Sequence, residues 1–352
     1  MTNQENKPTK VKRESKNKIR VDFDRTPLLE RMKGRYASMY FLGKIVWYIF
    51  RLALLIGVCY VILFPFYSKI SSSFMSIEDF ADVTVRLVPR YPTLETYSAI
   101  ITENEYLTAL GNTAILAGSC ALIQTFVCSL VGYGFAKFKF KFNKILFLLV
   151  VFTMIVPHST LKLSMLMEFR YFDIMGIFNL LGGGVVDWIR VIDGTSINLM
   201  NTYWPLWILS VTALAFKNGL YIFMLRQFFT GVPDELEESA YIDGSGTGRT
   251  FIQIILPLSV PMMITVFLFA FSWQWTDDFY TSLFFTTQKT LLLPKIVDVP
   301  GSLETNYPGQ NLYYAAIYNT CGLMIIMPLV IMYLFCQNFL VQGIERSGLT
   351  AD

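Results

Sequence analysis

The most chemically distinctive stretch of this sequence is a polar interval, residues 231–261, which lies between two strongly apolar segments. It holds one base, Arg249, and five acidic residues. The acids are Asp234, Glu235, Glu237, Glu238 and Asp243. No paired catalytic carboxylates, no nucleophile with an adjacent base and no metal-ligand set accompanies them. Such a surface is suited to docking on a basic cleft of a partner protein rather than to catalysis.

Helix and turn signals divide this interval into two short helices joined by a glycine. Pro233 suits a first helical position, and acids follow it where the helix dipole favours them. The first helix is predicted to end near Ile242, and Gly244 supplies the positive φ of a helix end. Thr247 can cap a second helix. Its apolar stripe at i, i+3, i+4 and i+7 is Phe251, Ile254, Ile255 and Leu258. We call residues 231–257 the elbow and expect it to lie flat on a membrane surface.

Fixed spacings connect the residues of the elbow. Glu238-Ser239-Ala240 is followed after three residues by Gly244, and after nine more by Ile254-Ile255-Leu256-Pro257. This arrangement resembles the EAA loop of bacterial ABC importer permeases, in which Glu-Ala-Ala, Gly and Ile-x-Leu-Pro recur at the same spacings. Ser239 replaces the first alanine of that pattern. The surrounding sequence looks most like the smaller permease subunit of maltose-like, carbohydrate-type importers.

The resemblance implies that the elbow docks on an ATPase. Glu238 matches the position that pairs with an ATPase arginine, and the small residues Ser239 and Ala240 would let the helix seat in its cleft. Gly244 would set the bend, and the Ile-x-Leu-Pro end would tie the elbow to the next membrane helix. The implied docking residues are Glu238, Ser239, Ala240, Asp243, Gly244, Ile254, Leu256 and Pro257.

Composition indicates an integral membrane protein. Of the 352 residues, 54% are apolar and 16% charged, and several apolar runs approach or exceed the ~18–20 residues that cross a bilayer as a helix. The predicted spans are residues 45–68, 106–135, 145–165, 205–228, 258–285 and 312–341. Pro157 should kink the third. We therefore predict an all-α protein with six transmembrane helices, which the resemblance makes a type I ABC importer permease fold.

The distribution of basic residues sets the expected topology. Lysine and arginine cluster in residues 1–44 and 137–144, so both segments, both termini and the elbow are expected in the cytoplasm. The basic tail 1–44 is either an arm on anionic membrane lipid or a solvated tail. The permease core is predicted over residues 106–343, and 344–352 forms a cytoplasmic tail. Residues 178–197 look like an insertion, with a small interfacial helix at 185–192.

Four residues are candidates for the translocation pathway. Lys217 interrupts the fourth predicted helix, where an ionisable group either serves function or faces another subunit or water. Trp275-Thr276-Asp277 resembles the Trp-Asn-Asp stretch of the family, with Asp278 following. Trp275 suits the membrane interface, and could also stack on a sugar.

Other chemistries find no support in the sequence. The five cysteines lie in apolar runs without a Cys-x-x-Cys spacing, and the one histidine, His158, follows Pro157 near a helix bend. No phosphate-binding loop is present. We therefore predict no catalytic residue, no metal, no cofactor and no nucleic-acid partner, and expect ATP hydrolysis in separate subunits.

The expected function is that of a permease subunit of an ATP-driven ABC importer in the bacterial inner (cytoplasmic) membrane. It would form half of the pathway for a carbohydrate, with a second, different permease, two ATPases and an extracellular solute-binding protein. Alternatives are an importer for another solute, such as glycerol phosphate or polyamine, or a membrane receptor or channel whose elbow binds another protein.

Overall fold

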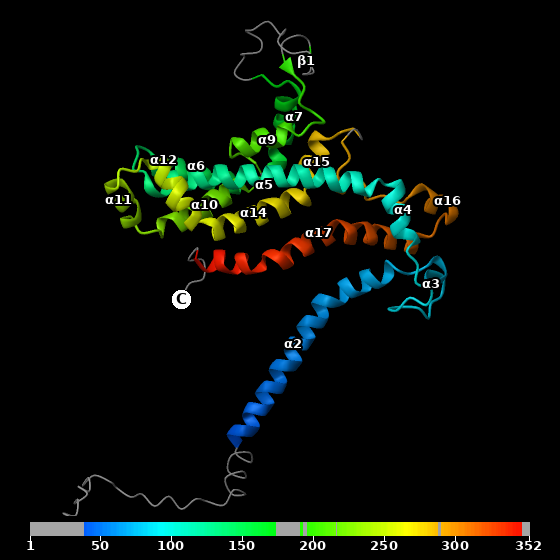
Figure 1. Ribbon diagram of the computed structural model, residues 1–352. Helices are drawn as coiled ribbons and strands as arrows, with labels where there is room; N and C mark the ends of the chain where they lie inside the picture. The colour runs from blue at the N-terminus through cyan, green and yellow to red at the C-terminus, as the bar shows by residue number, and fades with distance from the viewer. Residues whose placement is uncertain (1–38, 174–190, 193–195, 216, 288–289, 347–352) are drawn as a thin grey trace, which may run out of the picture. The chain divides into compact units, whose positions relative to one another are not determined.

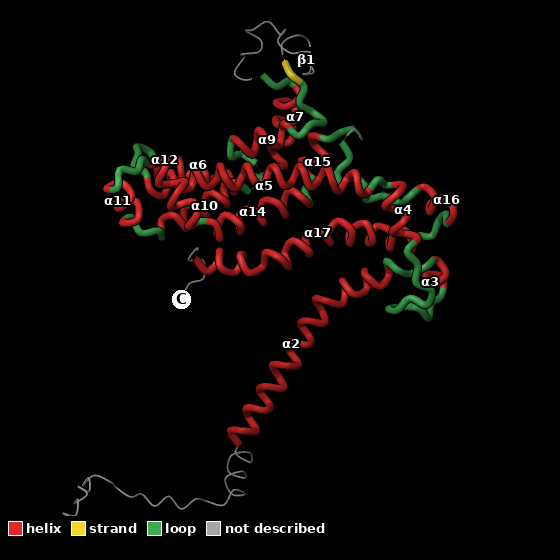
Figure 2. Tube along the Cα trace, in the orientation of Figure 1, coloured by secondary structure: helices red, strands yellow, loops and turns green. Residues whose placement is uncertain are grey.

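Nearly all of the regular secondary structure in the described parts of the chain is helical (Figures 1 and 2). The computed structural model describes residues 39–173, 191–192, 196–215, 217–287 and 290–346. Most of the basic tail, most of the segment expected to be an insertion and the end of the C-terminal tail lie outside these ranges. Contacts divide the chain into two units, residues 1–66 and 67–352.

Helix α2 (Met39–Ser72) begins in the first unit and crosses the boundary between the two units. Its segment Gly43–Ser72 is long and apolar enough to cross a membrane, and none of the window that passes this test is buried. A helix that is apolar on every side requires a lipid or protein environment. The predicted first span is therefore confirmed as a candidate membrane helix.

Helix α5 (Tyr106–Lys137) is central to the second unit. It packs against α9 (Trp204–Val211), α10 (Asn218–Thr230) and α14 (Val260–Trp275), and α14 packs in turn against α17 (Asn311–Arg346) (Figure 1). Small residues allow this packing to be close. Small residues of α5 that are fully buried include Ala109, Ala117, Cys120, Ala121, Cys128 and Ser129.

The shorter elements connect and extend these helices. They are α3 (Ile77–Ala81), α4 (Glu95–Glu103), α6 (Asn143–Ile155), η1 (His158–Leu161), α7 (Lys162–Arg170), β1 (Val191–Ile192), β2 (Ser196–Ile197), α11 (Glu235–Ile242), α12 (Thr247–Thr250), η2 (Phe251–Ile255), α13 (Leu256–Leu258), α15 (Phe279–Phe284), η3 (Leu293–Lys295) and α16 (Gly301–Asn306). The two strands pair antiparallel, with Val191 opposite Ile197. The prediction of a helix at 185–192 is therefore wrong for Val191 and Ile192, which form a strand. Residues 185–190 lie outside the described ranges.

Several predicted spans are broken in the structure. Among the described residues three helices are long and apolar enough to cross a membrane, or up to five spans if each bent pair counts as one. The third predicted helix turns by 91° between α6 and the helices after Pro157. The fourth is split into α9 and α10. The interruption ends at Lys217, where the sequence predicts it. The fifth, predicted to continue to residue 285, stops at Trp275, and α15 forms separately.

The segment between α15 and α17 folds back on the bundle where it is described. The side chain of Asn104 donates to the carbonyls of Ile296 and Asp298 at 3.0 and 2.9 Å. The amide of Leu293 donates to the hydroxyl of Thr113 at 2.9 Å. These bonds fix η3 and its flanks against the N-terminal part of α5 and against Asn104, which follows α4.

Candidate functional site

The first arm of the elbow is helix α11, which forms where the sequence predicts it. Its N-cap is Asp234, so Pro233 lies just before the helix rather than at its first position. The helix ends at Ile242, and Gly244 adopts φ +80°. No atom lies within 4 Å of a Cβ built on Gly244, so its left-handed backbone, and not lack of space, favours glycine there.

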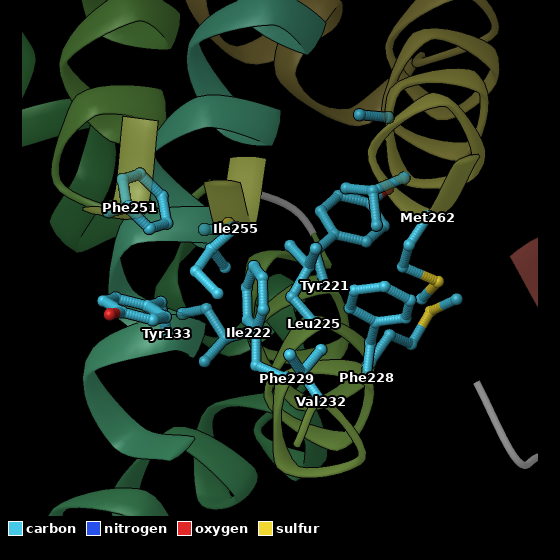
Figure 3. Packing of buried hydrophobic residues seen from close by; sticks show 14 of the residues in the cluster. Tyr133, Tyr221, Ile222, Leu225, Phe228, Phe229, Val232, Phe251, Ile255 and Met262 are labelled. Carbon is cyan, nitrogen blue, oxygen red and sulfur yellow. The ribbon is translucent and has the colours of Figure 1, made fainter. Parts of the chain in front are cut away.

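The second arm is α12, the π-helical turn η2 and α13. Gly246, not Thr247, is the N-cap of α12. Phe251 and Ile255 are buried, and the Phe251 ring lies 4.7 Å from that of Tyr133 on α5 (Figure 3). The predicted apolar stripe is correct at three positions but wrong at Leu258, which is exposed.

The Ile-x-Leu-Pro end lies at the junction with α14. Ile254 and Leu256 are partly buried against the cluster of Tyr133 and Phe251, whereas Pro257 is exposed. The chain bends by 77° between this arm and α14. The second arm therefore joins the surface of the elbow to a long helix of the bundle through a packed contact.

Five of the predicted docking residues are exposed. They are Glu238, Ser239, Asp243 and Gly244 at the first arm and its turn, and Pro257 at the end of the second arm. Ala240 is not among them, because its side chain is 5% exposed and is covered by this chain itself. The small size of Ala240 is thus required by packing within the chain. Ile242 was not among the predicted docking residues, but it is 86% exposed. A single apolar side chain in a polar interval does not mark a docking residue in the sequence.

A lysine from α5 holds the first arm. The Lys137 ammonium donates to the Val232 carbonyl at 2.6 Å and to the Asp234 carboxylate, and it lies 3.9 Å from Glu237. The side chains of Lys137 and Glu237 are only 6% and 11% exposed. The hydrogen bond and charge of Lys137 lower the pKa of Asp234, whereas burial raises the pKa of Glu237. In the sequence, Lys137 is one of the basic residues that indicate topology, and no local pattern links it to these acids.

The candidates for the pathway each make contacts of their own. Lys217 precedes α10 with φ +66°, and its ammonium lies 4.9 Å from the ring centroid of Trp273. Trp275 is 2% exposed and donates its indole N–H to the Ile325 carbonyl at 2.9 Å. The Asp277 carboxylate accepts from the amides at the start of α15, at 3.0 and 3.1 Å, and Asp278 is exposed beside it. Packing and capping therefore account for Trp275 and Asp277.

A bundle of apolar, interrupted helices with a polar elbow packed between two of them is the architecture of a transport permease. This chain belongs to the family of binding-protein-dependent transport system inner membrane components, whose model matches residues 128–346. Members of this family are components of transport systems, not enzymes.

The chain is similar to several curated permeases along most of its length. It is 26% identical to the trehalose/maltose transport system permease protein MalG of Thermococcus litoralis over 307 residues, covering 86% of this chain and 98% of that protein. It is 25% identical to the polygalacturonan/rhamnogalacturonan transport system permease protein YtcP of Bacillus subtilis over 293 residues, covering 79% and 89%.

A solved structure shares the fold. A chain of a bacterial ABC transporter involved in the import of the acidic polysaccharide alginate matches with a TM-score of 0.63 at 17% identity, covering 84% of this chain and 97% of that one. The fold is therefore that of a type I ABC importer permease, as the sequence resemblance predicts.

Proposed function

We propose that this chain is one permease subunit of an ATP-driven importer and forms half of the translocation pathway for a carbohydrate. The sugar transport systems named among its relatives support the substrate class. The proposal includes six spans, with both termini and the elbow in the cytoplasm. The domain assignment stays as the sequence predicts it, with the permease core over residues 106–343.

The geometry of the elbow is the observation that carries this proposal. Glu238, Asp243 and the apolar Ile242 lie on an exposed surface, which suits a basic cleft with an apolar floor on an ATPase. Behind that surface, Phe251 and Ile255 are anchored in the bundle (Figure 3). A displacement of the elbow by an ATPase dimer would thus reach α5, α10 and α14 as a rigid-body motion.

The proposed assembly contains a second permease, two separate ATPases and an extracellular solute-binding protein, in a bacterial inner membrane. One solved alginate transporter is in complex with a pentasaccharide-bound periplasmic protein, which supports a solute-binding partner here. No cofactor, metal or nucleic acid enters the proposed mechanism of this subunit.

The test is purification of this chain from its native membrane in mild detergent, with the co-purifying proteins identified. We expect an ATPase, a second permease and a sugar-binding protein, and the ligand of that binding protein names the substrate. A binding protein for glycerol phosphate or polyamine would replace the carbohydrate assignment. Recovery of the chain without any nucleotide-binding partner, in several detergents, would favour a receptor or channel.

A further inference from the structure

Two helix breaks in the second unit meet at one cavity of about 740 Å³. Val156 and His158, at the break between α6 and α7, form part of its lining. Thr212, Ala213 and Lys217, from the break between α9 and α10, form another part. Its size falls within the range of about 300–1,000 Å³ typical of small-molecule sites.

The backbone at the second break is irregular in a way that needs an explanation. Ala213 and Lys217 adopt φ +59° and +66°, which side chains other than glycine rarely do. In a membrane, interrupted helices persist where their backbone is covered by protein or lines a cavity, and binding sites of transporters are built at such interruptions. The first residues of α10, from Asn218 to Leu220, line this cavity.

Asn218 is the strongest sign of a ligand. Its side chain is completely buried, and neither its amide nitrogen nor its amide oxygen has a hydrogen-bond partner among the described residues. Buried amides are nearly always hydrogen-bonded, and a turn of this side chain toward the cavity that Asn218 lines would let a ligand supply the partners that it lacks. Since an amide both donates and accepts, a sugar hydroxyl suits it.

The charges of the lining favour an anionic ligand at this end. Lys217 lies at the N-terminus of α10, where the helix dipole also attracts negative charge. Glu168 on α7 is the acidic residue of the described lining. The remaining surface is mostly apolar and suits the carbon face of a sugar ring.

From these observations we propose that the cavity binds a carboxylate-bearing sugar in transit. Lys217 and the N-terminal amides of α10 bind the carboxylate, and Asn218 binds a neighbouring hydroxyl. The inference rests on the proposed import function and makes the substrate class narrower. It also makes Lys217 a specificity-determining residue, whereas Trp275 and Asp277 serve packing and capping.

The experiment uses the transporter purified with its partners. In this chain, Thr212 is replaced by cysteine, and Cys59, the exposed native cysteine, is replaced by serine. The rate of maleimide labelling at position 212 is followed by peptide mass spectrometry. Trigalacturonate, neutral maltotriose and glycerol 3-phosphate are compared at equal concentration. We expect saturating trigalacturonate to slow labelling roughly five-fold or more by mass action, with no effect of maltotriose.

Two further variants test the residue assignment. Lys217→Gln should abolish the protection, whereas Lys139→Gln, which removes an exposed lysine outside the cavity lining, should leave it unchanged. Protection by none of the probes overturns the binding site. Equal protection by maltotriose overturns the charge preference, protection by glycerol 3-phosphate alone reassigns the anion, and protection that persists in Lys217→Gln overturns the role of Lys217. Failure of an ATPase to co-purify would instead contradict the proposed function, whatever the labelling shows.

Discussion

The Lys137 ammonium lies 3.9 Å from the Glu237 carboxylate and joins the end of α5 to the first helix of the elbow. The same ammonium donates to the Val232 carbonyl at 2.6 Å. Because both side chains are largely buried, this contact differs from an ion pair in water, whose contribution is small. It fixes the docking helix directly to the bundle, independently of the apolar second arm.

Removing this lysine should loosen the elbow. Lys137→Ala leaves the Glu237 carboxylate without its nearby cation in a buried position, which costs about 3 kcal/mol in comparable pairs. We expect a lower Tm of the purified transporter and ATP hydrolysis that continues with reduced uptake per ATP. Thermal unfolding and a paired uptake and ATPase assay in lipid vesicles measure the two effects.

The matched control and the reciprocal exchange make the test specific. Lys139→Ala, at an exposed position two residues further, should change neither quantity. The double exchange Lys137→Glu with Glu237→Lys should recover part of the uptake-to-ATPase ratio, because it restores opposite charges at the contact. A double variant no better than Lys137→Glu alone would show that the pair does not couple the elbow to α5.

Substitutions at Gly244 should be tolerated only to the extent that the new residue can adopt a positive φ. At Gly244 φ is +80° and the space around a Cβ is open. Gly244→Val should therefore strain the turn by about 1–2 kcal/mol and reduce ATPase binding and uptake. Gly244→Asn should reduce both by less. Gly246→Val is the control, because Gly246 has φ −79° and equally open space. Equal uptake by the two valine variants would contradict the assignment of the turn.

Glu238 should act on the partner and not on the fold of this chain. Because its side chain is exposed, Glu238→Lys should leave the Tm and membrane level of the isolated chain unchanged but prevent co-purification of the ATPase. Glu235→Lys reverses an exposed charge on the same helix outside the Glu-Ser-Ala motif and should retain the ATPase. Normal uptake by Glu238→Lys would exclude the docking role.

Gly219 should be intolerant of any side chain. A Cβ there would lie 2.7 Å from the Thr153 hydroxyl oxygen and 3.0 Å from the Val150 carbonyl oxygen. Gly219→Ala must therefore push α6 away from α10, at a cost of about 1–3 kcal/mol for an overpacked contact, and lower the Tm. Gly118→Ala on α5, with no atom within 4 Å of the added Cβ, should not. Adding Thr153→Ala should restore only part of the loss, because the Val150 carbonyl remains.

Local signals in the sequence predicted the elbow, the bend after Pro157 and the interruption at Lys217, because proline, glycine and charge act on the backbone where they stand. Contacts between distant segments were not predictable. The pairing of Lys137 with the elbow and the burial of Ala240 depend on how α5 meets α11, which no spacing encodes. Helix α14 ends at Trp275, before the polar residues 276–278, but the mostly apolar residues 279–285 that follow led the sequence-based prediction to extend the helix too far.

The final prediction distinguishes capping from transport at Asp277. Its carboxylate accepts hydrogen bonds from the amides of Tyr280 and Thr281. Asp277→Ala should therefore destabilise α15 by about 1 kcal/mol, as loss of a helix cap does, and lower the Tm. Asp278→Ala should have no such effect, because Asp278 makes no side-chain capping bond.

Asp277→Asn keeps an acceptor for the cap while removing the charge, so it should retain both Tm and uptake. If the asparagine variant keeps its Tm but loses uptake, the charge of Asp277 serves the pathway and the capping explanation is insufficient.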